Sequence, residues 1–205
     1  DGERIAFRSE RDGGGLFVMG ATGESVRRVT DDGFDAAWSP DGKRLVYATE
    51  WVVDPVSRDS PSELWIVEVE TGRKERRLAG DAVQPAWSRR GDRIAYWANT
   101  NGQRDLWTVA AAGGEPVAVT ADVATDWSPE WSPDGRWLYF SSDRGGSFNL
   151  WRVPIDLATG GATGPPQPVT TGVRGMGYAR FAGDGSRLSA MTYERNDVAA
   201  IEQAV

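Results

Sequence analysis

The chain has 205 residues, a formal net charge of −7, and neither cysteine nor histidine. The acidic balance argues against nucleic acid or an anionic membrane as a partner, since both bind a basic face. The missing side chains exclude disulfides, Ser-His-Asp and Cys-His catalysis, and histidine-ligated metals.

No apolar run approaches the roughly 18 residues that a membrane-spanning helix needs, so we expect no membrane insertion. The lack of cysteine leaves the compartment open, and we favour a periplasmic or secreted location over a cytoplasmic one. We expect no cofactor. Calcium is the alternative, because three loops carry oxygen ligands; they are residues 12–15, 99–105 and 143–149.

One phrase recurs along the chain: Trp-Ser-Pro-Asp-Gly, a basic residue, and an apolar run. Its copies begin at Trp38, Trp87, Trp131 and Phe181, which are 44 to 50 residues apart. Ser-Pro ends one strand, and Asp-Gly forms a tight turn because glycine accepts the positive φ that such turns need. The apolar run forms the next strand. A repeat of this length with several short strands predicts a β-propeller.

The repeat divides the chain into five units, which we interpret as blades of one domain. The units are a partial blade at 1–34, full blades at 35–80, 81–120 and 121–170, and a partial blade at 171–205. Inner strands are expected to end at Trp38, Trp87 and Trp131. The other predicted strands are 4–9, 16–20, 26–30, 44–49, 63–70, 74–79, 93–98, 105–110, 116–120, 177–181, 187–193 and 198–204.

These units predict an all-β fold, a propeller of four-stranded antiparallel blades with about 18 strands. The first blade lacks its inner strand and the last lacks its outer strand, so we expect a piece of a larger ring. A compact five-bladed ring and a β-sandwich are the alternatives. Open edge strands would favour self-association.

The repeat phrase, followed by Asn149-Leu150-Trp151-Arg152-Val153 and Pro168-Val169-Thr170, resembles the TolB-like, WD-like propeller repeat of bacteria. The match is specific at Trp38 and Trp131 and degraded at the other two copies. The resemblance implies six or seven blades in an intact parent, a sensing, scaffolding or gating role beside other domains, and no shared catalytic residues. One related lyase branch uses a histidine-bound metal, which this chain cannot provide.

The connections that lead into the inner strands are the best candidates for a binding site, because they gather at one mouth of a propeller and differ from one another. Asp35, Gln84 and Tyr178 each lie three residues before the aromatic residue of an inner strand. We predict that they line the channel mouth, with Asp126 and Arg174 nearby. The alternative is a solvated rim that binds no ligand.

A second candidate is the long connection at 51–61, which carries Trp51, Val52 and Val53. An exposed Trp-Val-Val patch would suit a partner-binding protrusion. The alternative is a loop folded on its own blade.

We therefore expect a non-catalytic scaffold or sensor that binds a protein or peptide, as part of a larger bacterial protein. A second hypothesis is a glycosidase that uses Glu130, Asp35 and Asp126 as its carboxylates. A third is a repeat fragment without a ligand.

Overall fold

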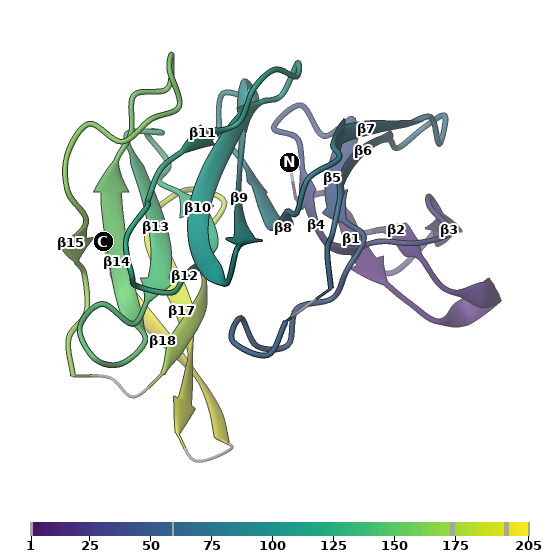
Figure 1. Cartoon of the computed structure of the whole chain (residues 1–205). Coiled ribbons are helices and arrows are strands. Elements are labelled where there is room, and N and C mark those ends of the chain that lie inside the picture. The colour runs from purple at the N-terminus through teal and green to yellow at the C-terminus, as the bar shows by residue number, and fades with distance from the viewer. Residues whose placement is uncertain (1, 59, 173–174, 195–196, 205) are drawn as a thin grey trace.

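The computed structural model describes residues 2–58, 60–172, 175–194 and 197–204, with side chains described up to residue 192. Over these residues 18 strands form five antiparallel sheets, three of four strands and two of three. The sheets follow one another along the chain, from purple to yellow in Figure 1. This arrangement confirms the predicted all-β propeller with incomplete blades at both ends.

Each sheet is a meander of strands that are consecutive in sequence. The strands are β1 Arg4–Arg8, β2 Leu16–Gly20, β3 Arg27–Arg28, β4 Phe34–Trp38, β5 Arg44–Ala48, β6 Leu64–Glu68, β7 Lys74–Leu78, β8 Val83–Trp87, β9 Arg93–Thr100, β10 Gln103–Ala110, β11 Val117–Ala118, β12 Asp126–Trp131, β13 Trp137–Ser142, β14 Asn149–Pro154, β15 Gln167–Pro168, β16 Met176–Phe181, β17 Arg187–Glu194 and β18 Asp197–Ala204. A short 3-10 turn, η1 Arg11–Gly13, joins β1 to β2.

The strands β4, β8, β12 and β16 begin their sheets and are called the inner strands below. Consecutive inner strands contact one another, so the sheets are arranged around them. Among the described residues, no helix has the length and apolar character needed to cross a membrane. That all the sheets belong to one domain stays a prediction.

The repeat phrase forms a hydrogen-bonded turn between the first two strands of a sheet. The Ser132 hydroxyl accepts the N–H of Trp137 at 3.0 Å and donates to the Asp134 carboxylate at 2.6 Å. The bond from Ser132 is the main cause that lowers the pKa of Asp134 to about 2. Ser39 and Ser88 each accept the N–H five residues further on, at 2.9 and 3.1 Å. The serine of the phrase therefore joins the two strands that the turn connects.

The outer strands β3 and β11 are two residues long, although the sequence predicts five. At the end of β11 the N–H groups of Val119 and Thr120 both donate to the Leu106 carbonyl, at 2.8 and 3.3 Å, so regular pairing stops there. The Thr120 hydroxyl in turn accepts the Leu106 N–H at 3.0 Å. Thr30 and Thr170 make the same bond in two other sheets, at 3.1 and 3.0 Å. The threonine thus ends the outer strand.

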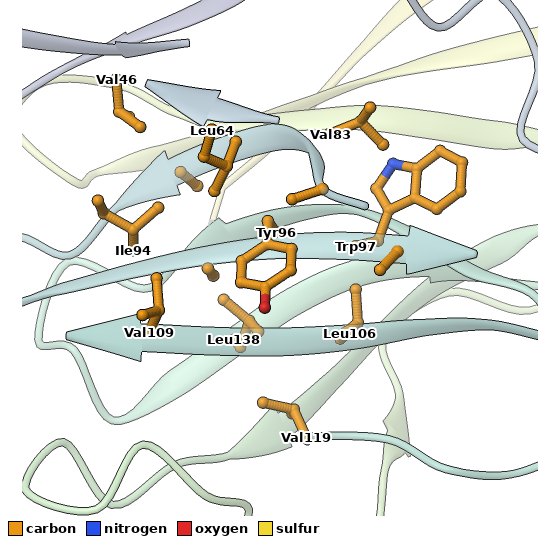
Figure 2. Close-up of a cluster of buried hydrophobic side chains, with 14 of the residues drawn as sticks. Val46, Leu64, Val83, Ile94, Tyr96, Trp97, Leu106, Val109, Val119 and Leu138 are labelled. Atoms are coloured by element: carbon orange, nitrogen blue, oxygen red, sulfur yellow. The ribbon is translucent and has the colours of Figure 1, made fainter. Parts of the chain in front are cut away.

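The core lies between adjacent sheets. Its largest cluster includes Val46, Leu64, Trp97, Leu106 and Leu138, which come from three consecutive sheets (Figure 2). Trp97, Leu64, Leu106 and Leu138 are 0% exposed. Burial of such side chains stabilises a fold by about 1.5–3 kcal/mol each.

The repeated tryptophans also join neighbouring sheets. Trp87 and Trp131 are 7% and 2% exposed, and the Trp131 indole N–H donates to the Ala86 carbonyl at 3.1 Å. That hydrogen bond satisfies the polar atom of a buried ring. It also links β12 to β8 in the preceding sheet.

The connection between β14 and β15 is bound to the preceding sheet. The Arg93 guanidinium donates to the carbonyls of Leu157 and Ala158, both at 2.7 Å. The Thr108 hydroxyl donates to the Gly160 carbonyl at 2.8 Å. This loop therefore fastens the fourth sheet to the third.

Candidate functional site

Every inner strand contains a bulge at the same position, three residues before its aromatic residue. The bulged residues are Asp35, Gln84, Ser128 and Tyr178, with φ of 51°, 49°, 54° and 53°. The pairing register of each inner strand shifts at this point. A left-handed backbone conformation is unfavourable for residues other than glycine, by roughly 1–2 kcal/mol per residue. The fold repeats the bulge, while the side chain at the bulge differs in every sheet.

Gln84 and Tyr178 are held by bonds within the fold. Gln84 is 2% exposed, and its Oε1 accepts the Trp97 indole N–H at 2.7 Å, while its Nε2 is buried without a partner. The Tyr178 hydroxyl donates to the Val52 carbonyl at 3.2 Å, and its ring meets Trp127 edge-on at 5.1 Å. Both side chains are therefore held by contacts within the fold, and neither is among the lining residues of the cavities described below.

Asp35 has a buried carboxylate oxygen, Oδ2, that accepts no hydrogen bond from the described residues. Burial raises the pKa of Asp35 to about 6, and the charge of Arg180 opposes that rise. The Arg180 guanidinium bonds the Ala179 carbonyl at 2.7 Å and lies 3.7 Å from Glu130. Arg180, the cation that opposes the rise, therefore has other partners.

A cavity of about 350 Å³ lies beside Asp35. Its lining comes from the turn after β1, the start of β4 and the loop after β5, and consists of Arg8, Ser9, Glu10, Phe34, Asp35 and Trp51. We call it the Asp35–Trp51 cavity. Asp35 and Trp51, which the sequence placed in separate candidate sites, thus meet in one.

The loop at 51–61 is tied to other sheets rather than folded on its own. Val52 is 2% exposed and packs in the largest core cluster, while Trp51 and Val53 are 64% and 67% exposed. Its Arg58 forms an ion pair with Asp81, with Nη1 and Oδ2 2.8 Å apart.

A second set of hydrogen bonds attaches the same loop to β10. The Arg104 guanidinium donates to the Pro55 carbonyl and, at 2.7 Å, to the Val56 carbonyl. With the bond from Tyr178 of β16, the loop is attached to two sheets besides its own. Trp51 is therefore presented on an anchored support.

Asp126 does not contribute to the described lining of this cavity. Asp126 is 0% exposed and pairs with Arg144 at 2.7 Å, and Arg144 also pairs with Asp122 at 2.9 Å. Burial raises the pKa of Asp126 to about 6, against the opposing effect of its hydrogen bonds and of Arg144. Arg174 lies outside the described residues.

Sequence reasoning missed Arg8, Glu10 and Phe34. Arg8 and Glu10 form an ion pair, and the Arg8 guanidinium lies 4.2 Å from the centroid of the Phe34 ring. Loops that follow β1 and β5 share one end of a propeller with the connections into the inner strands. Including the turn at 9–15 with those connections would have found Glu10; Arg8 ends β1 just before this turn, and Phe34 directly precedes Asp35.

A larger cavity, about 480 Å³, lies at the other end of the inner strands, where the repeat phrase turns. Trp38, Trp87, Arg89 and Glu130 contribute to its lining. Burial raises the pKa of Glu130, which accepts the Phe181 N–H at 3.3 Å. Glu130 therefore lies in a different cavity from Asp35.

Over the part of the chain that is described, no group of three or more aspartate or glutamate side chains is arranged to hold a metal ion. Calcium at the predicted loops stays untested.

Residues 37–204 match the family described as TolB beta propeller domain. The structure of TolB from Acinetobacter baumannii has a TM-score of 0.79 at 19% identity, covering 98% of this chain and 50% of that chain. An oligogalacturonate lyase from Vibrio parahaemolyticus has a TM-score of 0.66 at 14% identity, covering 98% of this chain and 58% of that one. At these identities the likeness concerns the fold.

The uncharacterized peptidase YuxL of Bacillus subtilis is 26% identical over 152 residues, which are 70% of this chain and 20% of that protein. The chain spans 18% and 20% of the length of the curated relatives it matches. Because the family match covers most of the sequence, the chain belongs to the TolB beta propeller domain family.

Proposed function

We propose that this propeller is a non-catalytic scaffold or sensor that binds a protein or peptide segment at the Asp35–Trp51 cavity. One observation carries the proposal: a buried carboxylate without a hydrogen-bond partner lies beside an exposed tryptophan in one cavity. A buried polar group without a partner costs about 1–3 kcal/mol, and more if charged. A ligand that pairs with Asp35 would remove that cost.

The surface around the cavity suits a peptide. Trp51, Val53 and Val56 are 64%, 67% and 56% exposed on the anchored loop. Tryptophan is enriched among residues that dominate binding energy, and a fixed backbone lowers the entropy lost on binding. The loop therefore offers apolar contact area next to a charged group.

The carboxylates are placed unfavourably for the glycosidase hypothesis. Glycoside hydrolysis needs two carboxyl groups about 5–10 Å apart across one substrate bond. Asp35 and Glu130 line separate cavities, and Asp126 is paired with Arg144. These placements favour binding over hydrolysis.

Two expectations remain proposals beside this function: a periplasmic or secreted location, and incorporation in a larger bacterial protein. Neither is needed for the binding test, which uses the 205-residue chain.

Selection of peptides displayed on phage, with the chain immobilised, tests the proposal. We expect enriched peptides that bind the wild-type chain and lose at least tenfold in affinity when Trp51 is changed to Ala. The matched control is Val123→Ala, at a side chain that is 97% exposed on another connection. Enriched peptides whose binding is the same in both variants, or no enrichment, would contradict the site.

A parallel assay tests the enzyme alternative. The wild-type chain and Glu130→Gln are incubated with a panel of oligosaccharides. We expect no release of reducing sugar by either protein. Turnover by the wild-type chain that Glu130→Gln abolishes would instead support the glycosidase.

A further inference from the structure

We propose that the Asp35–Trp51 cavity receives a basic side chain, arginine or lysine, of the bound segment. This inference rests on the proposed function and names the chemistry of the ligand. The reason is that some charged and aromatic side chains of the cavity already contact one another, whereas Asp35 and Trp51 do not have such partners among the described lining residues.

Arg8, Glu10 and Phe34 satisfy one another. The Arg8 guanidinium pairs with the Glu10 carboxylate and lies over the Phe34 ring, 4.2 Å from its centroid. The positive charge of the cavity is therefore neutralised within its own wall. An anionic ligand would find no unpaired cation among the lining residues.

Asp35 and Trp51 are not satisfied in this way. Asp35 Oδ2 is buried without a partner, and no described cation lies over the Trp51 ring. Trp51 is nevertheless 64% exposed at the edge of the same cavity. The cavity is thus lined by a carboxylate with an unpartnered oxygen and by an exposed indole.

A cationic side chain matches both groups. An indole is the aromatic ring that binds cations most strongly, and a guanidinium or ammonium can donate to a carboxylate at the same time. A neutral polar group would leave the charge of Asp35 unpaired. An acidic group would be repelled by Asp35 and by Glu10.

The dimensions and overall charge agree with this choice. A volume of about 350 Å³ is near the lower end of the range for small-ligand sites, about 300–1,000 Å³. It suits a long side chain better than a folded surface. The net charge of −7 also favours the approach of a basic segment over that of an acidic one.

The test uses two five-residue peptides with acetylated N-termini and amidated C-termini. One is Ala-Ala-Arg-Ala-Ala, and the other has citrulline, the neutral isostere of arginine, at the central position. Binding is followed by the backbone amide NMR signals of Ser9 and Phe34, two lining residues that every variant retains. We expect the arginine peptide to shift these signals saturably and the citrulline peptide to bind at least tenfold more weakly.

Two variants and a control localise the effect. Asp35→Asn is expected to weaken binding of the arginine peptide at least tenfold, and Trp51→Leu, which keeps an apolar side chain, is expected to abolish the preference for arginine over citrulline. The control is Glu115→Gln, an exposed carboxylate outside the cavity, which should change neither value. Thermal unfolding of each variant confirms that it is folded.

The outcomes separate this inference from the proposed function. Equal binding of the two peptides, no binding of either, or full binding by Asp35→Asn would overturn the basic-side-chain inference. Phage-selected peptides that lack arginine and lysine but depend on Trp51 would also overturn it, while leaving the proposed function intact. Failure of the phage selection removes the proposed function itself.

Discussion

Asp35 carries two features that oppose stability at a single residue. Its φ of 51° is unfavourable for a side chain with a Cβ, and its Oδ2 is buried without a partner. Residues that destabilise a fold in this way are expected where binding requires them. The left-handed φ is shared by the bulges of all four inner strands, so the feature of Asp35 that points to function is its unpartnered carboxylate oxygen in a residue that lines a cavity.

Replacing Asp35 with Asn is expected to stabilise the chain at pH 7. The folded pKa of about 6 lies above the ordinary value of 3.8, so the wild-type chain loses stability as the pH rises from about 4 through 6. Asparagine has no such titration. At about 1.4 kcal/mol per pKa unit, the gain at pH 7 is up to about 3 kcal/mol.

Urea unfolding of both proteins at pH 4 and pH 7 measures this gain. It should be present at pH 7 and absent near pH 4, where the carboxyl group is protonated in the folded chain. The charged groups around Asp35, namely Arg8, Glu10 and Arg180, are present in both proteins, so only their interactions with the Asp35 carboxylate differ between them. A variant that is less stable at pH 7 would contradict the account.

At the scale of elements, loops connect the sheets in addition to the core. The β14–β15 loop is bound by Arg93 and Thr108 of the third sheet. The loop at 51–61 reaches β10 and β16. Connections that the repeat pattern leaves irregular are therefore structural supports.

Gly160→Ala tests the first of these loops. Gly160 has a φ of 82°, and a Cβ there would collide with the Arg93 guanidinium and the Thr108 hydroxyl. We expect the free energy of unfolding to fall by about 2–4 kcal/mol, because backbone strain is added to the loss of buried hydrogen bonds. Thermal or urea unfolding measures this change.

The matched control is Gly146→Ala. Gly146 has a similar φ of 89°, but nothing lies within 4 Å of a Cβ built there. Its substitution should lower the free energy of unfolding by the backbone strain alone, about 1–2 kcal/mol. If both variants lose the same stability, the contacts of Gly160 with the third sheet contribute nothing.

At the scale of the whole molecule, β1 is the edge strand with which the first sheet begins. Among the described residues β1 pairs with β2 alone, whereas the second strand of each four-stranded sheet pairs on both sides. An unpaired strand edge can bind another strand. We therefore expect concentration-dependent self-association of the chain.

Light scattering over a range of protein concentrations checks this expectation. Ile5→Lys, within β1, should raise the monomer fraction because charged residues on an edge strand oppose pairing. Val26→Lys is the control, since Ile5 and Val26 are both 41% exposed and Val26 lies outside β1. A monomer at every concentration would count against association through this edge.

The repeat made most of the fold predictable. Strand bounds at β2, and at the starts of β1, β5 and β7, agree with the sequence prediction, because apolar runs and Asp-Gly turns are local signals. The short outer strands were missed. They end through threonine side-chain bonds to the neighbouring strand, a feature that strand propensity does not encode.

The candidate site was only partly predictable. Asp35 and Trp51 could be singled out by their positions along the chain, but their meeting in one cavity could not. Nor could the pairing of Asp126 with Arg144, which removes Asp126 from the accessible surface. Local patterns identify unusual residues without saying which of them share a space.

Local chemistry was thus sufficient for the sheet order, the turns and the family, since each depends on residues close together in the chain. The site depended on packing across long separations: the Tyr178–Val52 bond joins residues 126 positions apart and helps to hold the loop that presents Trp51. Such contacts form only when several sheets are assembled. That is why the architecture can be deduced from the repeat and the binding cavity cannot.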